Sequence, residues 1–324
     1  MRVKGWAITG AIVYGLYWSA GSFGLQALMQ SAIQSDTSSK AQNVALQLSP
    51  LRFTARVDGY EGQIDRHVML FAETIDVSIP TYAPNRARID MLGPIQIVGP
   101  AWTTTISSDD LSVGGSVQLT RKGDLGRFDI SGSNLTIEDP ETEAETIKMH
   151  LSPSGAGVYD LDLSLTNFTL PAKLTDAVLA TNFSDSFDPM HQLPEMVSEF
   201  SINGAVKFDP APALFGHSDP LIAGVDFAPL TLTWGDIDLT VDGLVDILPD
   251  GTPNGQLNVS LTGWETVLRA LAANGAIKPT NLMGYHAMAS GLAGDDGRIE
   301  FPLIFADGQM RLAAIPLGPA PKLR

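Results

Sequence analysis

The range Leu161–Phe168 reads LDLSLTNF, and the range Leu257–Trp264 reads LNVSLTGW. In both ranges apolar and polar side chains alternate, which is the two-residue period of a β-strand with one buried and one wet face. The second range begins 96 residues after the first, and at the same offset Gly155 corresponds to Gly251. The match predicts an internal duplication of a turn, a strand and the start of a helix, although two unrelated hairpins of similar composition would give the same pattern.

The same alternation returns along most of the chain after a polar stretch at 35–42. It is found at Val44–Leu48, Leu51–Val57, Trp102–Ile106, Val117–Leu119, Phe128–Ile130, Tyr159–Leu165, Leu230–Trp234, Ile237–Val241, Leu257–Leu261 and Ile299–Phe305. Glycine-rich turn sequences at 123–126 and 250–255 supply the backbone angles of tight reversals, so neighbouring strands are expected to pair antiparallel. The sequence therefore predicts a mainly β fold, a β-rich α+β protein of antiparallel meander sheets with a few short helices.

Helical patterns occur in two parts of the chain. The clearest is Trp264–Ala273, and Asn281–Leu292 is expected to follow it as a second helix. One face of the first helix carries Trp264, Val267, Leu268 and Leu271. In mid-chain we expect helices at Pro171–Ala180, where proline suits a first turn, and at Leu193–Phe200.

The N-terminal segment has no charged residue between Lys4 and Asp36. Within it, Trp6–Leu28 is long enough to cross a hydrocarbon layer that needs about 20 apolar residues. Because Arg2 and Lys4 precede this segment, the N-terminus is expected to stay in the cytoplasm and the rest of the chain to be exported. Residues 1–35 are therefore expected to be the anchor of a single-pass inner-membrane protein with its body in the periplasm.

Two further interpretations concern the same segment. It also fits a cleaved signal peptide, with an apolar region at Ala7–Ala20 and small residues at Ser19, Gly21 and Ser22, which would leave a soluble periplasmic protein. In addition, a strip of small residues recurs at every fourth position, at Ala7, Ala11, Gly15 and Ser19. Such a strip would let two membrane helices approach closely as a homodimer, although an Ala- and Gly-rich export segment gives the same spacing by composition.

The duplication suggests a division of the body into two modules. The expected first β-rich unit covers 36–200 and ends in helices, and the expected second unit covers 201–324 with helices and C-terminal strands. The chain is long enough for either two modules or one large β domain.

Charge and motif content restrict the function classes. The chain has 20 basic and 36 acidic residues, a net charge of −16, which disfavours nucleic acid and broad electrostatic docking on anionic lipid. It has no cysteine, no two-histidine zinc motif, no Gly-x-Ser-x-Gly elbow and no phosphate-binding loop. Asp236, Asp238 and Asp242 are interpreted as a solvated sheet face rather than a cation site. We therefore expect a non-enzymatic protein with no catalytic residues, no cofactor and no metal.

Several sequence features resemble the bacterial domain-of-unknown-function family 2125. They are the apolar N-terminal segment, the Gly59-Tyr60 turn, Trp234-Gly235 in a late strand, the helical region Trp264–Leu292, and the closing segment Asp307–Leu323, which reads DGQMRLAAIPLGPAPKL. Ala313 and Ala314 stand where glycine is expected. The resemblance implies a bacterial envelope protein without an assigned activity, so no residue role is carried over. The architecture is also similar to AsmA-type envelope proteins, which are associated with lipid handling.

Together these observations favour a protein that binds or shields a lipid or another apolar ligand. The candidate ligand face consists of Leu161, Leu163, Leu165, Leu257, Val259, Leu261 and Trp264. We expect the two strand units to face each other across an apolar cleft that the Trp264–Ala273 helix partly fills, since uncovered strands of this kind would expose too much apolar surface. The alternative is a structural or protein-interaction component with a closed core.

Overall fold

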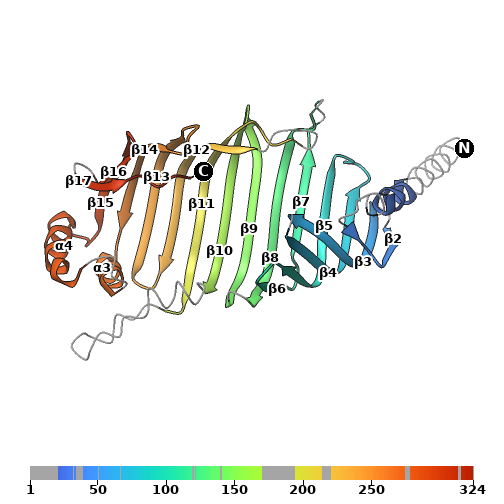
Figure 1. The fold of residues 1–324 in the computed structure, drawn as a ribbon, viewed down its shortest axis with the longest axis horizontal. Helices are drawn as coiled ribbons and strands as arrows, with labels where there is room; N and C mark the ends of the chain where they lie inside the picture. The colour runs from blue at the N-terminus through green and yellow to red at the C-terminus, as the bar shows by residue number, and fades with distance from the viewer. Residues whose placement is uncertain are drawn as a thin grey trace, which may run out of the picture. The chain divides into compact units, whose positions relative to one another are not determined.

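The protein is mainly β, as the alternation predicts, and a computed structural model gives its fold (Figure 1). The structure describes residues 21–31, 33, 39–49, 51–65, 67–118, 120, 122–138, 141–169, 194–213, 220–273, 278–312 and 315–323. Within these residues it contains seventeen strands and three short helical segments, and every strand pairing is antiparallel.

The chain forms two compact units. Unit 1 comprises 1–121 and 126–139, and unit 2 comprises 122–125 and 140–324. The expected boundary at residue 200 falls inside a strand, Met196–Asp209, that pairs with Val158–Thr169 along almost its whole length. Continuous pairing across the expected boundary keeps both strands in one unit.

Unit 1 contains eight strands, the last of which begins with a residue of unit 2. They are β1 (Ser39–Lys40), β2 (Asn43–Ser49), β3 (Arg52–Asp65), β4 (Val68–Pro80), β5 (Arg86–Val98), β6 (Thr103–Ser107), β7 (Ser112–Val117) and β8 (Leu125–Glu138). β3 pairs with β1, β2 and β4, while β5 pairs with β4, β6 and β7, and β6 pairs with β8.

A helix at 21–31 covers part of the apolar face of unit 1, beside β2 and β3 (Figure 1). Leu25 is buried against Phe53 and Ala55, and Met29 packs against the same cluster. The amide of Gln26 donates to the carbonyl oxygen of Val44 at 2.9 Å. The main core of the unit lies on this face and consists of Val44, Val57, Ala72, Ile75, Val77 and Ile95.

Unit 2 is a meander in which each strand pairs with the next along the chain. The strands are β9 (Glu141–Gly155), β10 (Val158–Thr169), β11 (Met196–Asp209), β12 (Leu221–Trp234), β13 (Ile237–Ile247), β14 (Pro253–Leu261), β15 (Ile299–Ala306), β16 (Gln309–Leu312) and β17 (Ile315–Pro319). The helices α3 (Trp264–Ala273) and α4 (Pro279–Leu292) lie between β14 and β15 in the chain. They occupy the β15 end of the row of strands in Figure 1.

Both predicted helices in this region are confirmed, but the start of α3 differs from expectation. The spacing of Thr262 and Glu265 predicts a capping box. Instead, the Thr262 hydroxyl accepts a hydrogen bond from the backbone of Asp238 at 3.2 Å, and the Thr266 hydroxyl donates to the Asp236 carboxylate at 2.8 Å. These side chains tie α3 to β13 rather than closing the helix on itself.

The prediction of a helix at Leu193–Phe200 is wrong, because this range enters β11. Val197 pairs with Phe168 and Phe200 pairs with Leu165, and Val197 is 1% exposed. Pairing along β10 decides the conformation here, over a weak helical pattern. The expected helix at Pro171–Ala180 lies outside the described residues.

The strand part of the repeat is confirmed for Leu161–Leu165 and Leu257–Leu261, which lie in β10 and β14. The copies then differ, because Phe168 is still in β10 whereas the corresponding Trp264 begins α3. Two corresponding positions, Asn167 and Gly263, also share a left-handed backbone, with φ of 44° and 64°. Because the helix of the first copy lies outside the described residues, the duplication stays a prediction.

None of the helices in the part of the chain that the structure describes is long and apolar enough to cross a bilayer. The transmembrane helix and the strip of small residues fall mainly on residues 1–20, which lie outside that part. Anchor, cleavage and dimer therefore remain expectations from sequence.

The orientation of the 21–31 helix gives a direct test. Leu25 is 7% exposed and Leu28 is 69% exposed. Leu25→Ala should lower the free energy of unfolding by about 2 kcal/mol or more, because it leaves a cavity against Phe53. Leu28→Ala, the matched control, should change it by less than about 0.5 kcal/mol. Urea unfolding of the detergent-solubilised full chain measures both, and equal effects would show that the helix does not pack through Leu25.

Candidate functional site: an apolar sheet face

Strand register places a continuous apolar surface on one side of unit 2. Residues directly opposite each other in an antiparallel pair point to the same side. Three neighbouring rows, each crossing from β9 to β15, define what we term the apolar face. The first row is Ile147, Leu165, Phe200, Leu232, Leu239, Leu261 and Ile299; the second is Met149, Leu163, Ile202, Leu230, Val241, Val259 and Phe301; the third is Leu151, Leu161, Gly204, Phe227, Gly243, Leu257 and Leu303.

The middle of the apolar face is only half-buried. Every member of the second row is half-buried, and in the other two rows only Leu151 and Ile299, at opposite edges, are buried. In a closed core these central side chains would be among the least exposed of the unit. Among the described residues, α3 and α4 reach only the β14–β15 side of this region, where Leu261 and Phe301 pack against the cluster of Trp264 and Ala289.

The ends of the strands are closed, in contrast to the middle. At one end Tyr159, Val206, Val245 and Phe305 are buried. There the Tyr159 hydroxyl donates to the carbonyl oxygen of Leu125 at 3.2 Å, and its ring meets that of Phe208 edge-on at 5.7 Å. Burial, with a smaller contribution from Asp124, raises the pKa of the Tyr159 phenol. The phenol thus stays neutral at this end of the face.

Two tryptophans close the other end. Trp234 packs with Val197 and Ile237, and its indole nitrogen donates to the carbonyl oxygen of Pro194 at 2.8 Å. Trp264 packs with Ala289 and Ile299, and its indole nitrogen donates to the carbonyl oxygen of Gly297 at 3.2 Å. The half-buried rows therefore lie between two closed ends.

Two glycines in the strands allow neighbouring backbones to approach closely at the apolar face. Gly243 has φ of 128°, and a Cβ atom there would collide with the carbonyl oxygen of Gln256. Gly255 has φ of 152°, and a Cβ atom there would collide with the carbonyl oxygen of Leu244. Glycines of this kind mark bends and close backbone approaches in sheets.

The opposite side of the same strands is polar. Hydroxyl groups form cross-strand hydrogen bonds of 2.7 Å, between Thr146 and Thr166 and between Ser201 and Thr231. Asp242 accepts from the side chain of Asn258 at 2.9 Å, in a hollow of about 320 Å³. The aspartates of β13 therefore face water, and the described residues contain no group of three or more His, Asp or Glu side chains that could hold a metal ion.

The predicted ligand-face residues divide into two sets. Leu161, Leu163 and Leu165 on β10 and Leu257, Val259 and Leu261 on β14 all lie on the apolar face and are half-buried. Trp264 is buried at the closed end instead, because α3 and α4 pack around it.

The expectation that β10 and β14 face each other across a cleft is wrong. Both strands belong to one sheet, and β11, β12 and β13 lie between them. Of the helix residues expected to fill a cleft, Val267 and Leu268 pack against the two tryptophan clusters, and Leu271 is 41% exposed. Sequence reasoning also missed most of the apolar face, including Ile202 and Phe227, although β11 and β12 show the same alternation.

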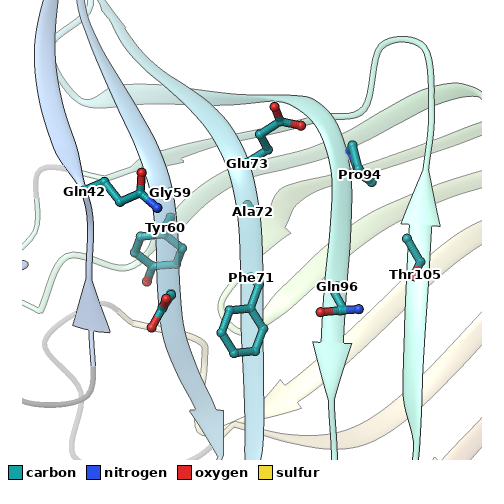
Figure 2. Close-up of a pocket in the computed structure, with 10 residues that line it drawn as sticks. Gln42, Gly59, Tyr60, Phe71, Ala72, Glu73, Pro94, Gln96 and Thr105 are labelled. Atoms are coloured by element: carbon teal, nitrogen blue, oxygen red, sulfur yellow. The ribbon is translucent and has the colours of Figure 1, made fainter.

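Unit 1 contains a separate hollow of about 360 Å³ (Figure 2). Phe71 on β4 lies between Tyr60 on β3 and Gln96 on β5, and Thr105 on β6 lies beyond Gln96 (Figure 2). The exposed carboxylates Glu61 and Glu73 also line it. The unbroken apolar run at 68–72 is the sequence signal that could have revealed Phe71 among the polar residues of this hollow.

Comparison with known proteins identifies the family. The model of a family described as an uncharacterized protein conserved in bacteria (DUF2125) matches residues 25–321, and the chain belongs to that family. No curated protein and no solved structure matches the chain. The family resemblance inferred from the closing segment and the Gly59-Tyr60 pair is thereby confirmed. The expected turn at Gly59-Tyr60 is wrong, however, because both residues lie inside β3. The backbone at residue 59 is left-handed, with φ of 58°, a conformation that glycine adopts more readily than other residues.

The close backbone approach at Gly243 can be tested by substitution. Gly243→Ala should lower the free energy of unfolding by about 1–3 kcal/mol, because alanine rarely adopts this backbone conformation and its Cβ atom has no space. The control is Gly291→Ala in α4, where a Cβ atom would meet nothing within 4 Å. This control should be neutral or raise stability by about 0.5–1 kcal/mol. Chemical unfolding of the full chain compares them, and a neutral Gly243→Ala would contradict the strained geometry.

Proposed function

We propose that this protein is a non-enzymatic, membrane-anchored component of the bacterial envelope that binds the acyl chains of a lipid on the apolar face of unit 2. The observation that carries the proposal is the set of seven-strand apolar rows whose middle is half-buried while both strand ends are closed. Large contiguous apolar surfaces of soluble domains commonly mark binding sites.

The dimensions of the apolar face suit an acyl chain. Seven strands spaced about 4.8 Å apart extend over about 29 Å. The hydrocarbon core of a bilayer, which holds two opposed acyl chains end to end, is about 30 Å thick. One chain lying across the strands would therefore fit within the face, and each methylene removed from water contributes about 0.8 kcal/mol.

The alternative proposal is a structural or interaction component with a closed core. Unit 1 favours it, because the 21–31 helix covers the apolar side of β2 and β3 there. Unit 2 favours lipid binding, because the described helices α3 and α4 pack at one end of its strands. Mass spectrometry of copurifying lipids separates the two proposals when the full chain is compared with a folded Leu163→Asp variant, because lipid held by the membrane segment is common to both. A closed core predicts no difference between them.

A single carboxylate placed on the apolar face should block binding. Leu163→Asp would put a charge in the middle row and should weaken uptake of a fluorescent fatty acid by about tenfold or more, because an unpaired charge is costly to bury under an acyl chain. The matched control is Ser164→Asp, which adds the same charge on the polar side opposite Lys148. It should bind normally. Val259→Asp on β14 repeats the test at the other repeat strand.

Loss of binding counts only for variants that keep the far-ultraviolet circular dichroism of the parent chain. A folded Leu163→Asp protein that binds as well as Ser164→Asp would overturn the lipid proposal and favour the interaction role.

The proposed location is the inner membrane, with the body in the periplasm. It rests on Arg2 and Lys4 before a long uncharged segment. A reporter enzyme that works only outside the cytoplasm, fused after Arg324, should be active in membrane fractions. Recovery of a soluble mature form starting near Ser22 would replace the anchor with a cleaved signal peptide. A homodimer through Ala7, Ala11, Gly15 and Ser19 remains a further proposal about the same segment.

A further inference from the structure

One end of unit 1 presents two exposed apolar side chains on adjacent turns. Leu51, in the turn between β2 and β3, is 65% exposed, and Tyr82, in the turn between β4 and β5, is 80% exposed. The backbone nitrogen and the hydroxyl group of Thr81 both donate to the carbonyl oxygen of Leu51, at 3.1 and 3.2 Å. These two bonds hold the turns side by side, so that Leu51 and Tyr82 project from the same end.

Residue 21, the first described residue of the 21–31 helix, lies at this end of unit 1. A Cβ atom on Gly21 would collide with the ring of Phe53, which follows Leu51 by two residues. From there the helix runs along β3, because Leu25 packs on Phe53 and Met29 packs on both Phe53 and Val57 clusters. In sequence, the uncharged N-terminal segment leads directly into residue 21. The chain thus links the proposed membrane segment to this end of the unit.

Charge distinguishes this end from the rest of the protein. The ranges 43–55 and 78–88, which form it, contain no Asp or Glu, whereas the whole chain has a net charge of −16. They contain three arginines. Arg88 binds Asp90 at 2.6 Å, while Arg52 and Arg86 are exposed and form no ion pair among the residues that the structure describes. This end of unit 1 is therefore locally basic, although the chain as a whole is acidic.

The opposite end of unit 1 provides an internal comparison. It also exposes apolar side chains, Ile64 at 59% and Trp102 at 46%. However, the segment Glu61–His67, which carries Ile64, has two acidic residues and one arginine in its sequence, so it lacks the excess of positive charge that attracts anionic head groups. Apolar exposure alone does not select an end, but charge and the position of residue 21 select the same one.

We propose that the end of unit 1 formed by Leu51, Arg52, Tyr82 and Arg86 rests in the head-group region of an anionic lipid bilayer. Tyrosine is enriched at the membrane–water interface, where its ring and hydroxyl group meet apolar and polar surroundings. Arginine pairs with phosphate oxygens in a bidentate geometry. This inference rests on the proposed membrane location, but it does not depend on lipid binding by the apolar face of unit 2.

The absence of cysteine makes the inference directly measurable. Single-cysteine full-length variants Leu51→Cys and Tyr82→Cys would carry an environment-sensitive fluorophore. The control is Ile64→Cys, an apolar position at the opposite end that is 59% exposed, close to the 65% of Leu51. The proteins would be reconstituted into vesicles of phosphatidylcholine with phosphatidylglycerol, some containing lipids spin-labelled near the head group. We expect strong quenching at positions 51 and 82, and little at position 64.

The arginines are tested in the Tyr82→Cys background. Arg52→Gln and Arg86→Gln should each lower the ratio of membrane-contacting to free label about fivefold in anionic vesicles, as expected for one basic residue at such a surface. With vesicles of phosphatidylcholine alone, the ratio of membrane-contacting to free label should fall in the same way for the Tyr82→Cys protein that keeps both arginines.

The possible outcomes separate the two proposals. If the protein floats with vesicles and positions 51, 82 and 64 are quenched equally or not at all, the orientation inferred here is overturned while the membrane location stands. If the unlabelled full chain does not float with vesicles, both the location and this inference fail. Quenching that changes neither with the phosphatidylglycerol content of the vesicles nor with either arginine substitution would also overturn the proposed contact with anionic lipid.

Discussion

Antiparallel pairing is the constraint on which the rest of this structure depends. Once β9 to β15 pair in register, each side chain has its face assigned, and a leucine in one strand meets an apolar partner in the next. The polar side gains cross-strand hydroxyl bonds such as Ser201 with Thr231. The other side gathers apolar groups that must be covered by a helix, by closed ends or by a ligand. The proposed function of unit 2 follows from this need to cover the apolar side of its strands.

The two units meet this requirement differently. In unit 1 the 21–31 helix places Leu25 and Met29 on the sheet, and the β3–β4 pair is reinforced on its other side by Arg56 and Asp76 at 2.7 Å. In unit 2, Trp234 and Trp264 are buried at one end and Tyr159 at the other, while the row through Leu163 and Val259 remains half-buried. The contrast between a covered and a half-open face is the physical basis for the proposal that unit 2 binds a ligand.

The alternation and periodicity of the sequence correctly predicted the features of secondary structure that depend on neighbouring residues alone. The alternation around Leu163 and Val259 correctly placed both residues on the apolar side of strands, and the periodicity of Trp264–Ala273 correctly gave a helix. Which strands become neighbours depends on pairings between distant residues. Sequence reasoning therefore set β10 opposite β14, although three strands separate them in one sheet. It also made a helix of the start of β11 and put Trp264 on the ligand face. The basic end of unit 1 was missed because a net charge carries no information about position.

The order of pairing in unit 2 also affects how the chain folds and how its length can change. From β9 to β17 each strand contacts the strand before it and the strand after it, so the unit behaves as a nearly one-dimensional array. Such an array can nucleate at any hairpin and grow outward, because most contacts are made between neighbours in sequence. It can also gain or lose a hairpin without rebuilding the others. A meander of this kind gives evolution a way to lengthen an apolar surface one hairpin at a time.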